Sequence, residues 1–207
     1  MIIYYCWVDQ IFTFSLNTQR KGGMKMKYAS EDLINEHEGI LFGLKILKRM
    51  AERLVGNTNI EIQDYYEIVN FLKLFADKCH HGKEEGFLFP AMEKAGIQNE
   101  NGPIGQMLYE HTIGRKYIAE MSGTMTENNI ERKVFIEYSE KYVELLRSHI
   151  EKENKVLFPM GDKKIPESEQ QKLIESFETF EEEVMGIGTH EKLHKMLNTF
   201  EAKYLNP

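Results

Sequence analysis

The chain has 207 residues and a formal net charge of −7 at pH 7, with its lysines and arginines interspersed among acids. This pattern argues against a nucleic-acid partner, and no apolar run approaches the roughly 18 to 20 residues that span a membrane. The only cysteines, Cys6 and Cys79, stand in unlike contexts. They indicate neither a disulfide framework nor a cysteine zinc site, so we expect a reducing, cytoplasmic setting.

Residues 1–25 read as a leader that differs from the rest of the chain. Its apolar start, Met1 to Val8, lacks the preceding positive region of a secretory signal. The codons of Arg20 to Gly23 would resemble a purine-rich ribosome-binding site just before Met24 and Met26. We therefore hypothesise that native translation starts at one of these methionines, and mass spectrometric detection of a native leader peptide would disprove it.

Helical signals begin at Ser30, a predicted N-cap followed by acids and by apolar residues at helical spacing. This first helix should end near Gly56. Capping-box spacing occurs from Thr58 and again from Asp64 and opens a second helix, which runs to about Lys94 and stops at the following glycine.

Proline and glycine mark the later boundaries. Pro90 should kink the end of the second helix. A turn before Pro103 opens a third helix, which ends at Ser122-Gly123. A fourth helix is expected from about Asn129 to Met160, with the glycine that follows closing it.

Two shorter helices should follow, one starting at Pro166 and one from about Thr189 to Tyr204. Short connections between long helices indicate antiparallel neighbours. We therefore predict an all-α protein with an up-down-up-down four-helix bundle over residues 26–162. Residues 163–207 would form a C-terminal helical extension packed on the bundle.

Two segments of the chain repeat each other without a gap. In each, a histidine precedes a glutamate by four residues, and Leu-Phe-Pro follows: His80 and Glu84 in the first, His149 and Glu153 in the second. Residues four apart lie on one face of a helix, so each pair can direct an imidazole and a carboxylate to one point. That arrangement is typical of metal ligands.

The helix that precedes each repeated segment also carries a histidine directly after a glutamate, Glu36-His37 and Glu110-His111. The bundle is therefore predicted to consist of two similar helical hairpins. Any one of these histidines could be an ordinary core residue with a hydrogen-bond partner. Four of them with two glutamates would be costly to bury together unless a cation neutralised them. We therefore predict a metal site built from His37, His80, Glu84, His111, His149 and Glu153.

The residues next to His80 and Glu84 leave alternatives open for the metal ligands. The apolar residues Leu72 and Ala76 share the face of His80, which favours His80 and Glu84 as the inward pair. His81 and Glu85 are then expected on the solvated face or next to the ligands, and they remain candidates for additional metal binding.

Imidazole and carboxylate donors suit iron, manganese or zinc. Two carboxylates able to bridge, with two histidines for each metal, favour a dinuclear centre. Two carboxylate-bridged, non-haem iron ions are the simplest content, with manganese or zinc as alternatives. Coordination would be incomplete, leaving positions for dioxygen, nitric oxide or peroxide.

The segments EH (36–37), HHGKEEGFLFP (80–90), GPIGQMLYEHTIGRKY (102–117) and HIEKENKVLFP (149–159) resemble the hemerythrin-like, or HHE cation-binding, family. The resemblance implies a four-helix bundle with a di-iron site and maps its ligand motif onto the same six residues. Classical hemerythrins carry a second histidine one turn after the third-helix ligand, where this chain has Arg115. The remaining set of four histidines and two glutamates is more similar to bacterial iron-centre repair proteins of the superfamily.

The sequence His190-Glu191-Lys192-Leu193-His194 matches the short HExxH pattern of zinc peptidases. No further glutamate follows at a useful distance. We favour a helix that docks on the bundle, with His190 or His194 covering the site or supplying the missing ligand.

The favoured function is that of a cytoplasmic di-iron protein that binds dioxygen, nitric oxide or peroxide for sensing, storage or protection. The alternatives are a di-iron enzyme of oxidative or nitrosative stress defence or iron–sulfur repair, and a metal-responsive interaction module. A binding role is preferred over a dedicated enzyme, and no catalytic residue is assigned.

Overall fold

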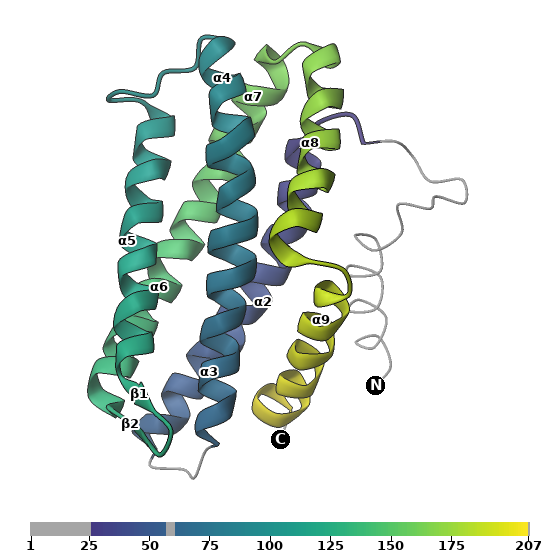
Figure 1. Cartoon of the computed structure of the whole chain (residues 1–207). Helices are drawn as coiled ribbons and strands as arrows, with labels where there is room; N and C mark the ends of the chain where they lie inside the picture. The colour runs from purple at the N-terminus through teal and green to yellow at the C-terminus, as the bar shows by residue number, and fades with distance from the viewer. Residues whose placement is uncertain (1–25, 57–60, 207) are drawn as a thin grey trace, which may run out of the picture.

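The computed structural model describes residues 26–56 and 61–206. Within these ranges, four long helical runs form a bundle and two further helices line one side of it (Figure 1). The first hairpin comprises α2 (Ser30–Val55), α3 (Ile62–Phe71), η1 (Leu72–His81), η2 (Glu84–Leu88) and α4 (Phe89–Lys94), where η marks a π-helical segment. The second comprises α5 (Pro103–Gly123), α6 (Arg132–Lys152), η3 (Glu153–Leu157) and α7 (Phe158–Lys164).

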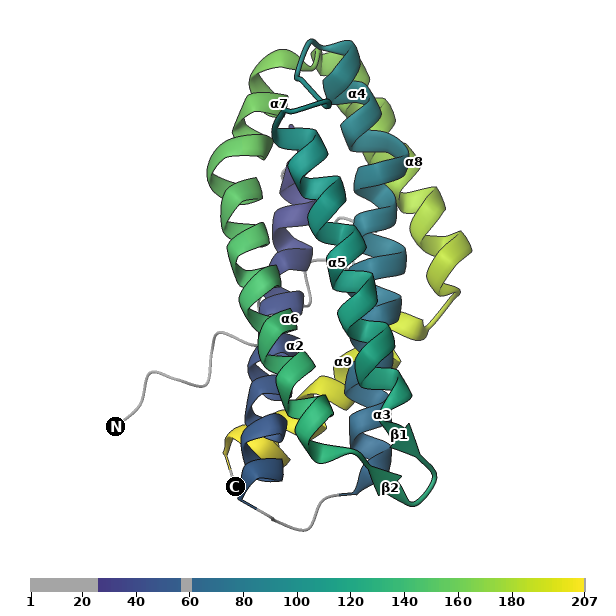
Figure 2. The ribbon, with the colours of Figure 1, turned by 90° about the vertical axis from the view of Figure 1, so that its left-hand side faces the viewer.

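A short antiparallel ribbon, β1 (Met125–Thr126) with β2 (Asn129–Ile130), joins α5 to α6, which run side by side in Figure 2. The C-terminal extension comprises α8 (Glu167–Met185), α9 (Thr189–Phe200) and η4 (Glu201–Leu205). Helix α8 packs on η1 and η2, and η4 packs on α2. The all-α bundle with extra C-terminal helices is confirmed, and no helix in the described ranges is long and apolar enough to cross a membrane.

Several predicted helix boundaries are confirmed. Helix α2 ends at Val55 with Gly56 as C-cap, and Gly96, with φ of 80°, follows the end of α4. Helix α5 begins with Pro103 after its N-cap Gly102. The leader hypothesis and the capping box from Thr58 lie outside the described residues.

Other boundaries were wrong. Ala29, not Ser30, is the N-cap of α2, because the Ser30 hydroxyl instead donates a hydrogen bond to Asp162, 2.6 Å away. Asp64 lies inside α3, where it accepts a hydrogen bond from the Tyr204 hydroxyl of η4. Asn129 belongs to the ribbon, so the fourth helical run starts only at α6.

Gly161 does not end the fourth helical run, which continues through α7 to Lys164. A Cβ at Gly161 would lie 2.4 Å from Met92 Cε, so this glycine permits close packing between α7 and α4. A π-helical segment precedes both Pro90 and Pro159. The wider π-turn rearranges the hydrogen bonding where proline provides no N–H.

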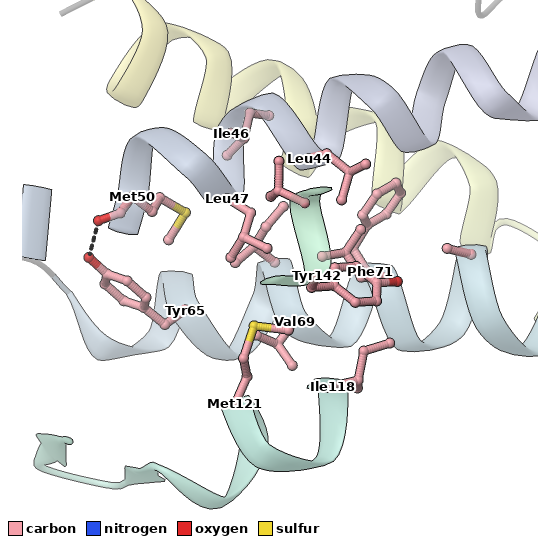
Figure 3. Close-up of a cluster of buried hydrophobic side chains, with 14 of the residues drawn as sticks. Leu44, Ile46, Leu47, Met50, Tyr65, Val69, Phe71, Ile118, Met121 and Tyr142 are labelled. Carbon is pink, nitrogen blue, oxygen red and sulfur yellow. Dashed lines mark hydrogen bonds between the residues drawn. The ribbon is translucent and has the colours of Figure 1, made fainter. Parts of the chain in front are cut away.

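The core consists of two apolar clusters with a polar layer between them. Figure 3 shows part of the larger cluster, where Leu44 and Leu47 of α2 meet Tyr142 of α6. Along α2, Leu33 belongs to the smaller cluster and Ile40 to the larger one, and His37 lies between them. The histidines and glutamates predicted from the sequence therefore form a layer across the bundle, with an apolar cluster on each side of it.

Candidate metal centre

The six side chains predicted to form a metal site all project into this polar layer. Each is at most 1% exposed: His37, His80, Glu84, His111, His149 and Glu153. They come from all four helical runs, so only the assembled bundle brings them together.

Each of the four histidines is oriented by an outer side chain. In each ring Nδ1 donates a hydrogen bond to a carboxylate or amide oxygen: His37 to Asn154 (2.8 Å), His80 to Glu36 (2.8 Å), His111 to Glu85 (2.7 Å) and His149 to Glu110 (2.9 Å). Such a bond places the proton on Nδ1, leaving Nε2 free to coordinate a metal. Burial, partly opposed by Glu36, lowers the pKa of His80 to about 4, which favours the neutral imidazole that metals bind.

The two buried glutamates each span the two hairpins. Glu153 places Oε1 3.2 Å from His149 Nε2 and Oε2 3.3 Å from His37 Nε2. Glu84 places Oε1 3.7 Å from His80 Nε2 and Oε2 3.3 Å from His111 Nε2. Each carboxylate therefore lies between a histidine of the first hairpin and a histidine of the second.

His81 lies in the same layer, so of its two expected positions the solvated face was wrong and the place next to the other candidate ligands agrees with the structure. It is 2% exposed, and its ring stacks on that of His111 with centroids 3.8 Å apart. The prediction failed because it used α-helical spacing, whereas His80 and His81 end the π-helical segment η1. A π-turn holds one more residue than an α-turn, so adjacent side chains diverge less and both histidines face inward.

The donor atoms form two clusters that share one carboxylate. Within each cluster they lie within 4.8 Å of one another: His81, Glu84, His111 and His149 in one, and His37, His80, Glu84 and Glu153 in the other. One cluster thus holds three imidazoles and the other two.

Several buried polar atoms in this layer have no hydrogen-bond partner among the described residues, including both oxygens of Glu84 and of Glu153. Each such atom costs about 1–3 kcal/mol when left unpaired. Burial and the charge of Glu153 raise the pKa of Glu84 well above its ordinary value. Burial acts likewise on Glu153, but His149 and His37 hold its pKa well below the ordinary value. A cation would satisfy these atoms, so the residues fit a metal.

A comparison with protein families gives a match to the model of the Hemerythrin HHE cation binding domain over residues 29–161. The match covers more than half of the chain. The chain belongs to the hemerythrin HHE cation-binding family. No curated protein and no solved structure gives a significant match. The family and the buried clusters together indicate cation binding in this hemerythrin domain.

The repeat of this hemerythrin domain extends to residues that the sequence reasoning missed. Glu36 accepts from His80 and from Lys83, and Glu110 accepts in the same way from His149 and Lys152. Burial opposes the ionisation of Glu36, but Lys83 lowers its pKa to about 2. The signal was present in the sequence. A glutamate directly precedes His37 and His111, and a lysine follows His80 and His149 by three residues.

Glu85 contacts a histidine of the layer from outside. Its carboxylate accepts hydrogen bonds from His111 and from Arg115, the latter at 2.6 Å. Arg115, at the place of the classical fifth histidine, also donates to Asp77 at 2.7 Å. Arg115 therefore holds Glu85 on the outer side of the layer, and His81 is a fifth imidazole within the layer.

From the sequence, His190 or His194 was expected to cover the site or to supply a missing ligand. Neither belongs to a metal-binding cluster among the described residues. The His190 ring lies instead 2.6 Å from Glu181 of α8 and stacks edge-on against Phe75. Because α9 packs outside the four helical runs, it does not reach the polar layer.

Proposed function

We propose that this hemerythrin domain holds two non-haem iron ions and binds dioxygen, or a related molecule such as nitric oxide or peroxide, for sensing, storage or protection. The observation that carries the proposal is the pair of clusters joined at Glu84, with His81 adding a fifth imidazole. This donor set resembles that of classical hemerythrins more than the four-histidine set of the repair proteins.

The donor count favours iron over zinc. If both carboxylates bridge, one position has five protein donors and the other has four. Structural zinc is almost always tetrahedral, whereas iron accepts mixed imidazole and carboxylate donors at higher coordination number. Manganese remains an alternative for the same donors. The position near His37 and His80 has fewer donors and is the one with more room for an incoming ligand.

Bound iron would supply the redox chemistry for reversible binding of dioxygen. The chain itself positions and shields the site. The outer partners of the Nδ1 atoms hold the imidazoles in place, so little reorganisation accompanies metal binding. Leu33 and Ile40 flank His37 from the two apolar clusters. These clusters limit the access of water.

Metal analysis followed by rapid mixing tests the proposal. After anaerobic reconstitution with iron(II), we expect about two iron ions per chain, and mixing with oxygen should give a stable oxygenated absorption band. Less than one iron per chain would refute the di-iron centre. Rapid irreversible oxidation with peroxide consumption would favour an enzyme, and no spectral response would favour an interaction module.

The adjacent glutamates offer a matched pair of variants. Glu84→Gln should abolish binding of both metal ions because Glu84 belongs to both clusters. Glu85→Gln changes only an outer partner of His111, so both ions should stay bound with affinity lowered by at most about 10–100-fold. In metal-free protein, Glu84→Gln should change the unfolding free energy by less than about 1 kcal/mol, because the amide replaces a carboxyl without hydrogen-bond partners. Iron analysis and thermal unfolding measure both effects. Retained iron in Glu84→Gln would count against the shared position.

A further inference from the structure

A buried lysine connects the metal centre to the C-terminal extension. Lys83 is fully buried, and its Nζ contacts the carboxylates of Asp32 at 3.0 Å, Glu36 at 2.7 Å and Glu181 at 2.6 Å. Glu181 comes from α8, outside the part of the chain that matches the family. An ammonium buried among three carboxylates is strongly held, and all of these groups depend on one another for charge compensation.

The second hairpin shows the same arrangement without the extension. Lys152 stands at the position of Lys83 in the repeat and binds Glu110, but its side chain is 38% exposed. The residue before it, Glu151, is exposed, whereas the equivalent residue in the first hairpin is Gly82. The two halves of the site therefore differ in what covers their lysines.

Gly82 is what allows α8 to approach the first hairpin. A Cβ at Gly82 would lie 2.7 Å from Cζ of Phe180 on α8. The Phe180 ring also meets Phe87 of η2, with centroids 5.4 Å apart. Charge pairing and apolar packing thus fix α8 at the same place on the bundle, directly outside the histidine layer.

A continuous line of contacts runs from α8 to the metal centre. Glu36 uses Oε1 to bind Lys83 and Oε2 to bind His80 Nδ1, so the position of Lys83 determines how Glu36 holds the imidazole. Glu181 in turn holds Lys83 from the opposite side. The neighbouring group of Glu36, Cys79 and Glu181 is not a second metal site, because the Lys83 ammonium already lies between the two carboxylates.

We propose that Glu181 is a positioning residue of the metal centre, and that docking of α8 and occupation of the metal position beside His80 stabilise each other. This inference rests on the proposed metal function. Because coupling between two binding events is reciprocal, the metal must strengthen α8 docking as much as docking strengthens metal binding. The position beside His149, whose lysine no extension covers, is independent of α8.

The test compares Glu181→Gln with Glu182→Gln, a control at an exposed position of the same helix. Each full-length protein is loaded with iron(II) without oxygen and challenged with a chelator. Outer partners of metal ligands typically change affinity by about 10–100-fold. We expect Glu181→Gln to release one of its iron ions at least about tenfold faster than the wild type and the other at the unchanged rate. The control, Glu182→Gln, should release both iron ions at the wild-type rates.

The second readout is proteolysis at the turn between α8 and α9, Gly186 to Gly188. Metal loading should slow cleavage in the wild type and in Glu182→Gln but not in Glu181→Gln. A third variant, Gly82→Leu, displaces Phe180 without removing any charged group, and it should reproduce the selective loss of one iron. Circular dichroism verifies that each variant is folded.

The possible outcomes separate the inference from the proposed function. Equal release rates in Glu181→Gln and the wild type, with unchanged metal protection at the turn, would overturn the coupling. Equal acceleration for both iron ions would overturn it as well, because that result indicates a general loss of structure. If the wild type binds no iron, the proposed function fails and this inference fails with it.

Discussion

Neighbouring residues of identical type have different roles in this site, and their surroundings decide which. Glu84 is fully buried between the imidazoles of His80 and His111, whereas the adjacent Glu85 is part-exposed and binds Arg115. His80 and His81 are both buried, but only His80 has a carboxylate partner within hydrogen-bonding distance of Nδ1. Asp77 lies 3.6 Å from Nδ1 of His81. Residue type therefore predicts donor chemistry, and the local helix geometry determines the role.

The assignment of His81 to the metal centre predicts that His81→Asn weakens metal binding at the cluster of three imidazoles by at least about tenfold. Chelator competition and the iron content per chain measure this. His194→Asn is the matched control, because His194 belongs to neither cluster, and its iron content should equal that of the wild type. Equal effects of the two substitutions would exclude a specific role for His81.

At the scale of helices, small local features determine how the runs pack. The π-helical segments η1, η2 and η3 all carry residues of the polar layer, in agreement with the frequent occurrence of π-turns at functional sites. Glycines at points where two helices cross have a different role from the π-helical segments, because the lack of a side chain lets the two helices pack closely. The sequence pattern shows the glycines but not which of them lie at a crossing.

Two helical glycines test this distinction. A Cβ at Gly43 of α2 would lie 2.4 Å from Cε1 of the buried Phe71, whereas Gly86 has no atom within 4 Å. Gly43→Ala should therefore lower the unfolding free energy by about 1–3 kcal/mol through overpacking. Gly86→Ala should raise it by up to about 1 kcal/mol through the better helix propensity of alanine. Denaturant unfolding of the metal-free variants measures both, and the same sign for the two would contradict the packing argument.

The pair of His190 and Glu181 ties α9 to α8 and makes this contact sensitive to pH. Burial opposes the charge on the ring, but the hydrogen bond and the charge of Glu181 raise the pKa of His190 above its ordinary 6.5. A raised folded-state pKa contributes stability that is fully present below pH 6.5 and is lost as pH rises through the folded value. NMR titration of zinc-loaded protein should show the raised pKa, and Glu181→Gln should return it toward 6.5. An unshifted ring in the wild type would disprove the pairing.

In the whole molecule, two apolar clusters hold the bundle together and the polar layer between them acts against stability. The clusters join residues of all four helical runs, so we expect them to hold the bundle together without a metal. The layer buries two carboxylates whose oxygens lack hydrogen bonds among the described residues. The metal-free protein should therefore be folded but strained at its centre.

Metal removal tests this description. A ligand present at 1,000 times its dissociation constant stabilises a protein by about 4 kcal/mol. At about 2–4 °C per kcal/mol for a chain of this size, the midpoint of thermal unfolding should rise by about 10 °C when metal is added. Far-UV circular dichroism should show the same helix content with and without metal. Loss of helices on chelation would mean that the apolar clusters do not hold the bundle alone.

The sequence by itself determined the class of fold, the division into hairpins and the six side chains that meet in the core. Each depends on periodicity, on proline and glycine, or on an exact internal repeat, and these signals are local. It also predicted mixed imidazole and carboxylate donors, because donor chemistry belongs to the residue type.

Only the tertiary structure decided that His81 faces inward, that Gly161 serves packing, and that Lys83 is buried against α8. The physical reason is that each depends on a neighbour distant in sequence or on a change of helix type. Periodicity assumes a regular α-helix and assigns one face to each residue, so the inward direction of His81 in η1 escapes it. The contact of Glu181 with Lys83 joins residues 98 positions apart, which no local pattern reveals.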